Sequence, residues 1–187
     1  MKIAITTAAD EQTISVESPY LADFVGRARA LGGRWSAAER AWIFDAAAEE
    51  PVRALLRDVY GTDGSEEQMG IAAPVTLYVY ATQETRGERA PLTLQSGITL
   101  ARAFGRDSGA RLGDSVAHLR GPKPTSGGSM KNWRTCIPKG CLLAVYAVPR
   151  ALAERALLDT GYTCSIGDGT EQPDAVLARL SAEGTRS

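Results

Sequence analysis

The sequence lacks a long apolar run, which argues against a helix that crosses a membrane. The longest run, Cys141 to Pro149, falls far short of the roughly 20 residues that a bilayer requires. The first residues alternate apolar and polar side chains, whereas a signal peptide carries a continuous apolar stretch. We therefore expect a strand at the amino terminus and a cytoplasmic protein without a membrane partner.

Cysteine and histidine are also scarce. The cysteines are Cys136, Cys141 and Cys164, and His118 is the single histidine. Secreted folds more often carry an even and denser set of cysteines. Structural zinc ligands usually come in closely spaced pairs, and the sequence offers one loose pair, Cys136 and Cys141. We expect buried thiols, with neither a metal site nor a cofactor.

What is present is an ordinary globular composition with an uneven charge distribution. Apolar residues make up 44% of the chain and charged residues 23%, and 187 residues suffice for one domain or two small ones. Residues 1–70 hold 7 Lys/Arg against 12 Asp/Glu, whereas residues 86–139 hold 10 against 3. A local basic excess attracts phosphates. A solvated surface with scattered arginines is the plainer interpretation, and it stays open.

Apolar periodicity predicts a ββαββα module over residues 1–62. A proline at the first helical position favours a helix start at Ser18-Pro19, and glycines favour helix ends. The expected elements are strands at 2–7 and 13–17, a helix from Ser18-Pro19 to Gly32-Gly33, strands at 34–36 and 41–44, and a helix from Pro51 to Gly61. Such a unit packs its helices on one face of an antiparallel sheet and leaves the other face free.

The remainder predicts a polar linker over 63–73 and a basic, mixed α+β domain over 74–187 with short, largely antiparallel strands. The expected strands lie at 74–81, near 92–95, 98–104 and 115–120, at 141–148 and at 162–166. Residues 98–104 are alternatively one or two helical turns. The expected helices lie at 149–158 and 173–183, and the expected loops at 82–91 and 121–128. The fold class is therefore α+β.

One stretch resembles known families. It reads Leu31-Gly32-Gly33-Arg34-Trp35 and continues with Ala41-Trp42-Ile43-Phe44. It resembles the HARP domain of annealing helicases and the small LGARWD module of conjugative and plasmid primases. The resemblance implies a nucleic-acid context and a phage, plasmid or other mobile element, with Arg34 and Trp42 as contacts. A Walker A motif is absent, so the chain would be an accessory part without a helicase motor.

Two interpretations of the tryptophans stay open at this stage. On adjacent short strands, Trp35 and Trp42 would stack on each other and seal a small core. Alternatively they form an exposed platform for unpaired bases, flanked by Arg34 and Arg40.

Residues Ser126 to Arg134 form a basic, glycine-rich segment, which we expect to be a loop. Its glycines let backbone amides approach a ligand, and Lys131 and Arg134 donate to phosphate oxygens. Trp133 lies between them, and basic residues interleaved with an aromatic ring suit a single strand. A mobile loop whose tryptophan packs back onto the domain is the alternative.

The segment Gly105 to Gly109 predicts a tight turn. A catalytic interpretation uses Asp107 and His118 as acid and base, with Ser108 as nucleophile. No G-x-S-x-G motif surrounds the serine, and a histidine within an expected strand is more often packed and hydrogen-bonded.

The first hypothesis is a non-enzymatic protein that binds single-stranded or distorted nucleic acid through Arg34, Arg40, Trp42, Lys131, Trp133 and Arg134. The second is an inhibitor or adaptor that docks on a host nucleoprotein complex, as anti-defence proteins do. The third is a nucleotide-directed enzyme that uses Asp107, Ser108 and His118. We expect binding rather than catalysis.

Overall fold

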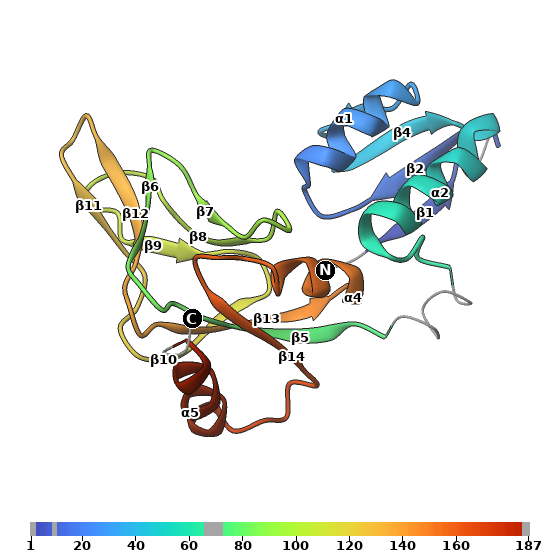
Figure 1. Ribbon diagram of the computed structural model, residues 1–187. Helices are drawn as coiled ribbons and strands as arrows, with labels where there is room; N and C mark the ends of the chain where they lie inside the picture. The colour runs from blue at the N-terminus through green and yellow to red at the C-terminus, as the bar shows by residue number, and fades with distance from the viewer. Residues whose placement is uncertain (1–2, 9–10, 66–72, 185–187) are drawn as a thin grey trace. The chain divides into compact units, whose positions relative to one another are not determined.

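The computed structural model describes residues 3–8, 11–65 and 73–184 (Figure 1). The chain divides into two compact units. The first unit comprises Met1–Ala73 with Pro149–Leu152, and the second comprises Pro74–Val148 with Ala153–Ser187. Both contain helices and short antiparallel strands, which confirms the α+β class.

The first unit is a four-stranded antiparallel sheet in the order β1-β2-β4-β3 with two helices. Its elements are β1 (Ala4–Thr7), β2 (Thr13–Glu17), α1 (Ala22–Ala30), β3 (Arg34–Ser36), β4 (Ala41–Asp45), a 3-10 turn (Ala46–Ala48) and α2 (Glu49–Tyr60). Alternate residues of β2 and β4, among them Ile14, Val16 and Phe44, are buried. Val52, Leu55, Leu56 and Val59 of α2 are also buried, as their helical spacing predicts.

The start of α1 differs from the prediction. The helix begins at Ala22, and its amino-terminal cap, Leu21, has no side-chain hydrogen bond. The expected start at Ser18-Pro19 is wrong because the Pro19 carbonyl accepts a hydrogen bond of 2.6 Å from the Tyr60 hydroxyl. Residues 18–20 therefore precede the helix with Pro19 bound to the last residue of α2, and burial raises the pKa of Tyr60.

The Gly32-Gly33 pair ends α1, as predicted, and each glycine has its own reason. Gly32 has a φ of 81°, the left-handed conformation that glycine adopts at low cost. At Gly33 a Cβ would lie 2.5 Å from the Phe44 ring and 2.8 Å from the Ala28 carbonyl oxygen. Gly32 therefore reverses the chain, and Gly33 lets it pass close to the core.

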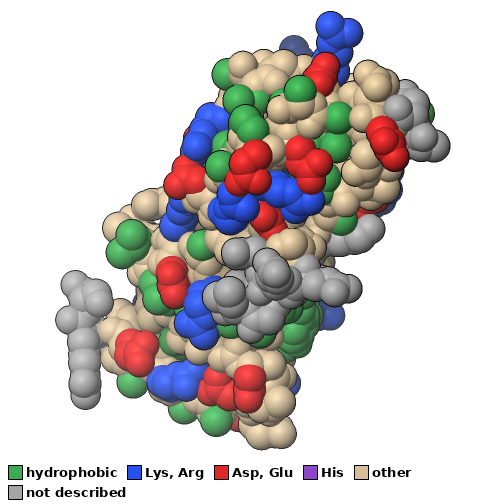
Figure 2. Space-filling model, turned by 90° about the vertical axis from the view of Figure 1, so that its right-hand side faces the viewer, with side chains coloured by type: hydrophobic (Ala, Val, Ile, Leu, Met, Phe, Trp, Pro, Cys, Tyr) green, Lys and Arg blue, Asp and Glu red, His purple; other side chains and the backbone are tan. Residues whose placement is uncertain are grey.

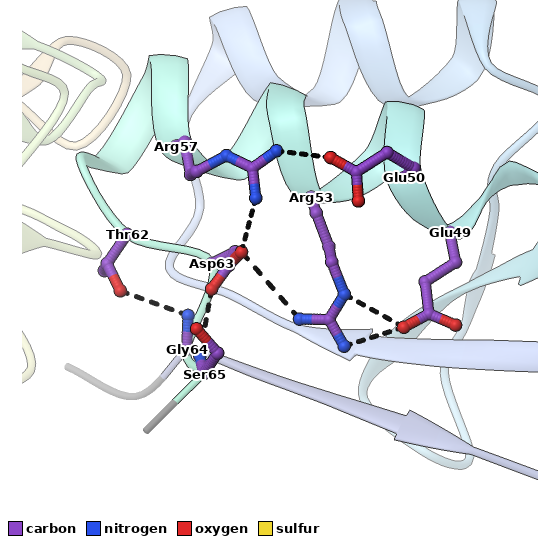
Figure 3. Close-up of polar contacts among 8 residues, drawn as sticks. All are labelled: Glu49, Glu50, Arg53, Arg57, Thr62, Asp63, Gly64 and Ser65. Atoms are coloured by element: carbon purple, nitrogen blue, oxygen red, sulfur yellow. Dashed lines mark hydrogen bonds and ion pairs between the residues drawn. The ribbon is translucent and has the colours of Figure 1, made fainter. Parts of the chain in front are cut away.

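The residues that follow α2 are anchored by a buried carboxylate (Figure 3). The side chain of Asp63 is 3% exposed, and it accepts a hydrogen bond of 2.7 Å from Arg57 and another of 3.0 Å from the Ser65 amide. The Arg53 guanidinium lies 3.8 Å away. Burial by itself would raise the pKa of Asp63, but the bonds from Ser65 and Arg57 and the charge of Arg53 outweigh it and lower that pKa.

Glu49 and Glu50 complete this network from the first turn of α2. Glu49 accepts hydrogen bonds of 2.9 and 2.7 Å from Arg53, and Glu50 accepts one of 2.6 Å from Arg57. The network holds residues 63–65 of the expected linker 63–73, while residues 66–72 lie outside the described residues.

The second unit contains three antiparallel sheets in the orders β10-β13-β5-β14, β11-β12-β6 and β7-β8-β9. Its strands are β5 (Val75–Tyr80), β6 (Thr85–Glu88), β7 (Leu92–Thr93), β8 (Thr99–Ala103), β9 (Ala110–Leu112), β10 (Val116–Arg120), β11 (Thr125–Gly128), β12 (Trp133–Ile137), β13 (Leu142–Val148) and β14 (Thr163–Gly167). Helix α5 (Pro173–Glu183) lies beside the β10-β13-β5-β14 sheet (Figure 1). Its Val176 and Leu180 pack against Tyr78 and Leu142 of that sheet. Helix α4 spans Arg150–Ala156, with its first residues in the first unit and the rest in the second.

Several expected elements of this unit are confirmed and others are wrong. Strands β5, β10, β13 and β14 and helix α5 fall where the apolar pattern predicts them. The expected loop 82–91 contains β6, the expected loop 121–128 contains β11, and the prediction missed β9 and β12. Strand β11 has the sequence Thr-Ser-Gly-Gly, which offers no apolar alternation, and its pairing with β12 makes it a strand.

Candidate nucleic-acid interface

The tryptophans of the first unit divide between core and surface. Trp35 and Trp42 are paired across β3 and β4, with ring centroids 5.9 Å apart. Trp42 is 6% exposed and also meets the Phe24 ring edge-on at 6.2 Å, whereas Trp35 is 52% exposed. A covered ring offers no face for a base, so Trp42 belongs to the core and Trp35 is the exposed indole.

The two candidate arginines of this unit lie on β3 and in the turn that follows it. Arg34 precedes Trp35 on β3, and successive residues of a strand point to opposite faces of the sheet. Arg40 is exposed in the turn before β4, with a φ of 54°. The face that Arg34 shares with Ile43 also carries exposed Glu17 and Asp45 on neighbouring strands, so that face is mixed in charge.

The segment Ser126 to Arg134 is a hairpin rather than the expected loop. Strands β11 and β12 pair Gly128 with Trp133 and Gly127 with Arg134. The Asn132 amide donates to the Ser129 hydroxyl at 3.0 Å across the turn, where Lys131 is exposed. Because Trp133 and Arg134 are neighbours on a strand, their side chains point to opposite faces and form no single basic and aromatic surface.

Arg134 has an unusual position within the hairpin. A Cβ at Gly127 would lie 3.7 Å from the Arg134 Nε atom, so the arginine lies over the strand position that carries no side chain. That Nε atom is buried and has no hydrogen-bond partner among the described residues. Glycine at position 127 leaves room for the guanidinium.

The structure brings the Gly105–Gly109 turn against this hairpin. The Ser126 hydroxyl donates to the Arg106 carbonyl at 2.7 Å and accepts from the Gly109 amide at 3.0 Å. Thr135, which is fully buried, accepts from the Ala103 amide at 3.0 Å and so joins β12 to β8. Two segments that the sequence marks separately are therefore neighbours.

The catalytic candidates have other partners. The Ser108 hydroxyl accepts from the Phe104 and Gly105 amides at 3.0 and 3.2 Å, as expected for a tight turn. Asp107 forms an exposed ion pair of 2.8 Å with Arg106. The Nε2 atom of His118 lies 2.9 Å from the Gly121 carbonyl oxygen, which agrees with a packed, hydrogen-bonded histidine. The hydrogen bonds seen in the described part of the chain do not connect these candidates to one another.

Sequence reasoning missed a cluster on β8 and β9. Arg102 and Arg111 are directly opposed in the register, and their guanidinium carbons lie 5.0 and 5.5 Å from the centroid of the Phe104 ring. Phe104 is 56% exposed, and both arginines are exposed. The sequence indicates that Arg102 and Phe104 lie on the same face of an expected strand, because they are two residues apart. Only the pairing of β8 with β9 shows that Arg111 belongs to the same cluster.

Much of the positive charge between residues 86 and 139 is uncompensated. Ion pairs in this stretch join Arg86 to Glu84, Arg106 to Asp107 and Arg120 to Asp174. The basic side chains of the stretch that form no ion pair with any described residue are Arg89, Arg102, Arg111, Lys123, Lys131, Arg134 and Lys139. By contrast, Figure 2 shows a face on which Lys/Arg and Asp/Glu side chains lie beside one another.

The expectation of buried thiols is confirmed for two of the three cysteines, and Cys164 is half-buried. Cys136 and Cys141 are buried, and burial raises the pKa of Cys141 and of Cys164 to about 12. Within residues 3–8, 11–65 and 73–184, no group of three His, Cys, Asp or Glu side chains is placed to hold a metal ion. None of the helices in the same ranges is long and apolar enough to cross a membrane.

No protein-family model, curated protein or solved structure matches the chain.

Proposed function

We propose that this protein is a non-enzymatic accessory protein that binds nucleic acid through the second unit. The observation that carries the proposal is the set of arginines and lysines between residues 86 and 139 that have no ion-pair partner among the described residues. A basic side chain without an acidic partner keeps its charge available for an external anion. Sequence-independent affinity for nucleic acid comes mainly from such charges, which displace counterions from phosphates.

The first unit supports this function as a HARP-like module. Its support is the resemblance of residues 31–44 and the element order, in which two helices accompany a four-stranded sheet of order β1-β2-β4-β3. Gly32, Gly33 and Trp42 have structural roles in this module, so the resemblance points to a shared fold. Arg34, Arg40 and exposed Trp35 are the side chains with which the module would touch nucleic acid or a partner protein. A phage or plasmid origin is the context that the resemblance implies.

The test is a salt series with a fluorescent oligonucleotide and purified full-length protein. Anisotropy should show binding that weakens as salt rises, with a linear relation between the logarithms of affinity and salt concentration. For a single strand, replacing two phosphate-contacting arginines by glutamine (R102Q/R111Q) should reduce the slope by about 1.4, because each contact contributes about 0.7. The matched control is R27Q/R29Q on α1 of the first unit, which changes the same charge at residues outside the proposed contacts. Absence of binding at low salt would refute the proposal.

A further inference from the structure

The cluster of Phe104, Arg102 and Arg111 has the chemistry of a site for an unpaired base. Phe104 lies just beyond β8 and is displayed to solvent with more than half of its side chain exposed, so the core does not need it. Exposed single apolar residues are common on protein surfaces. Here two guanidiniums lie at 5.0 and 5.5 Å from the ring centroid, which makes the ring part of a basic surface.

We propose that Phe104 stacks an unpaired nucleobase while Arg102 and Arg111 bind the adjacent phosphates, so that the ligand is a single-stranded segment. This inference rests on the proposed function and adds the substrate class. Stacking on a ring requires a free base face, which a base inside a duplex does not offer. Proteins that bind single strands without sequence preference stack bases on aromatic rings and neutralise the phosphate backbone with basic side chains of the same surface.

Beside the Phe104 ring, the local charges favour Arg102 and Arg111 as the phosphate contacts. Arg102 and Arg111 form no ion pair with any described residue, whereas nearby Arg106 is neutralised by Asp107 at 2.8 Å. Contact with the Phe104 ring holds the guanidiniums in place, and each retains N–H donors for phosphate oxygens. The turn that follows Phe104 is fixed by the hydrogen bonds of Ser108 and Ser126. The ring is therefore presented by a rigid support.

The experiment separates base contacts from phosphate contacts. Three fluorescent ligands of equal length are compared by anisotropy with the full chain: a single-stranded oligothymidine, a strand of abasic sites and a duplex. Wild-type protein should bind the oligothymidine most tightly. Phe104→Ala should weaken that binding about five- to 150-fold, the range for loss of one stacked base, and should leave binding of the abasic strand unchanged. R102Q/R111Q should weaken the binding of the oligothymidine and of the abasic strand by the same factor.

Matched variants guard against a folding defect. Phe104→Trp keeps a stacking ring and should retain the preference for bases. Tyr20→Ala removes an exposed aromatic side chain of the first unit that is not among the proposed contacts, and it should leave all three affinities unchanged.

Three results would overturn the inference while leaving nucleic-acid binding intact. They are equal affinity of the wild type for the abasic and base-carrying strands, an equal loss on both with Phe104→Ala, and loss of the base preference with Phe104→Trp. Competition by poly-glutamate as effective as that by oligothymidine would mean that the surface is made for an acidic protein. A wild type that binds none of the three ligands would instead refute the proposed function.

Discussion

Asp63→Asn should destabilise the first unit by about 2 kcal/mol at neutral pH. The carboxylate is 3% exposed, accepts a bond of 2.7 Å from Arg57 and faces Arg53 at 3.8 Å. Hydrogen bonds to charged groups contribute about 1.5–3 kcal/mol each, and a neutral amide keeps the shape without the charge. Both arginines retain Glu49 and Glu50 as partners, which holds the loss near the lower end of that range.

The assay is thermal unfolding in a Trp133→Phe background, where the remaining tryptophans, Trp35 and Trp42, both report on the first unit. A loss of about 2 kcal/mol corresponds to a fall of roughly 10 °C in the Tm of a unit of this size. The control is Asp23→Asn, which removes the same charge from an exposed ion pair of 3.8 Å with Arg27. It should cost less than about 1 kcal/mol.

The pH dependence gives an independent check. The pKa of Asp63 is lower in the folded than in the unfolded protein, so its contribution is present at neutral pH. It is lost as the pH falls below the ordinary aspartate value of about 3.9 and through the folded pKa. The difference between wild type and Asp63→Asn should therefore shrink in acid. An unchanged difference between pH 7 and pH 3, or a variant within about 0.5 kcal/mol of wild type at pH 7, would refute this reasoning.

Three further substitutions test the packing. Gly33→Ala should destabilise the first unit by about 1–3 kcal/mol, because its Cβ would lie 2.5 Å from the Phe44 ring. Gly26→Ala should stabilise the same unit by up to about 1 kcal/mol, because a Cβ there meets nothing within 4 Å and the position is helical; urea denaturation checks both. Thr135→Val should cost the second unit about 1–3 kcal/mol, because it leaves the buried Ala103 amide without its 3.0 Å acceptor. Calorimetry that found Thr135→Val neutral would contradict the role given to this hydroxyl.

Sequence periodicity predicted the elements whose burial follows a local pattern. Helix α5 has the expected bounds because Pro173 begins it and Val176 and Leu180 recur at helical spacing. Strand β13 was recognisable as a buried run. Strand β11 was not, because Thr-Ser-Gly-Gly carries no pattern and becomes a strand only through its partner β12.

The candidate site was harder to predict because it depends on register and burial. Arg102 and Arg111 are nine positions apart in the chain, and the pairing of β8 with β9 places them on one ring. Which of Trp35 and Trp42 is covered depends on Phe24, which α1 places against Trp42. The burial of Asp63 likewise depends on arginines of α2, six and ten positions earlier, that close over it.

The most direct test of the central claim is photo-crosslinking of the full chain to a single strand that carries 5-bromouracil, followed by mapping of tryptic peptides. Cleavage after Arg102 and Arg106 releases residues 103–106 as a short peptide that contains Phe104. The crosslinked base should be recovered on this peptide, and Phe104→Ala should abolish the crosslink. Crosslinks found only on the peptide that contains Trp35, or no crosslink on any peptide, would contradict the claim that nucleic acid binds the second unit.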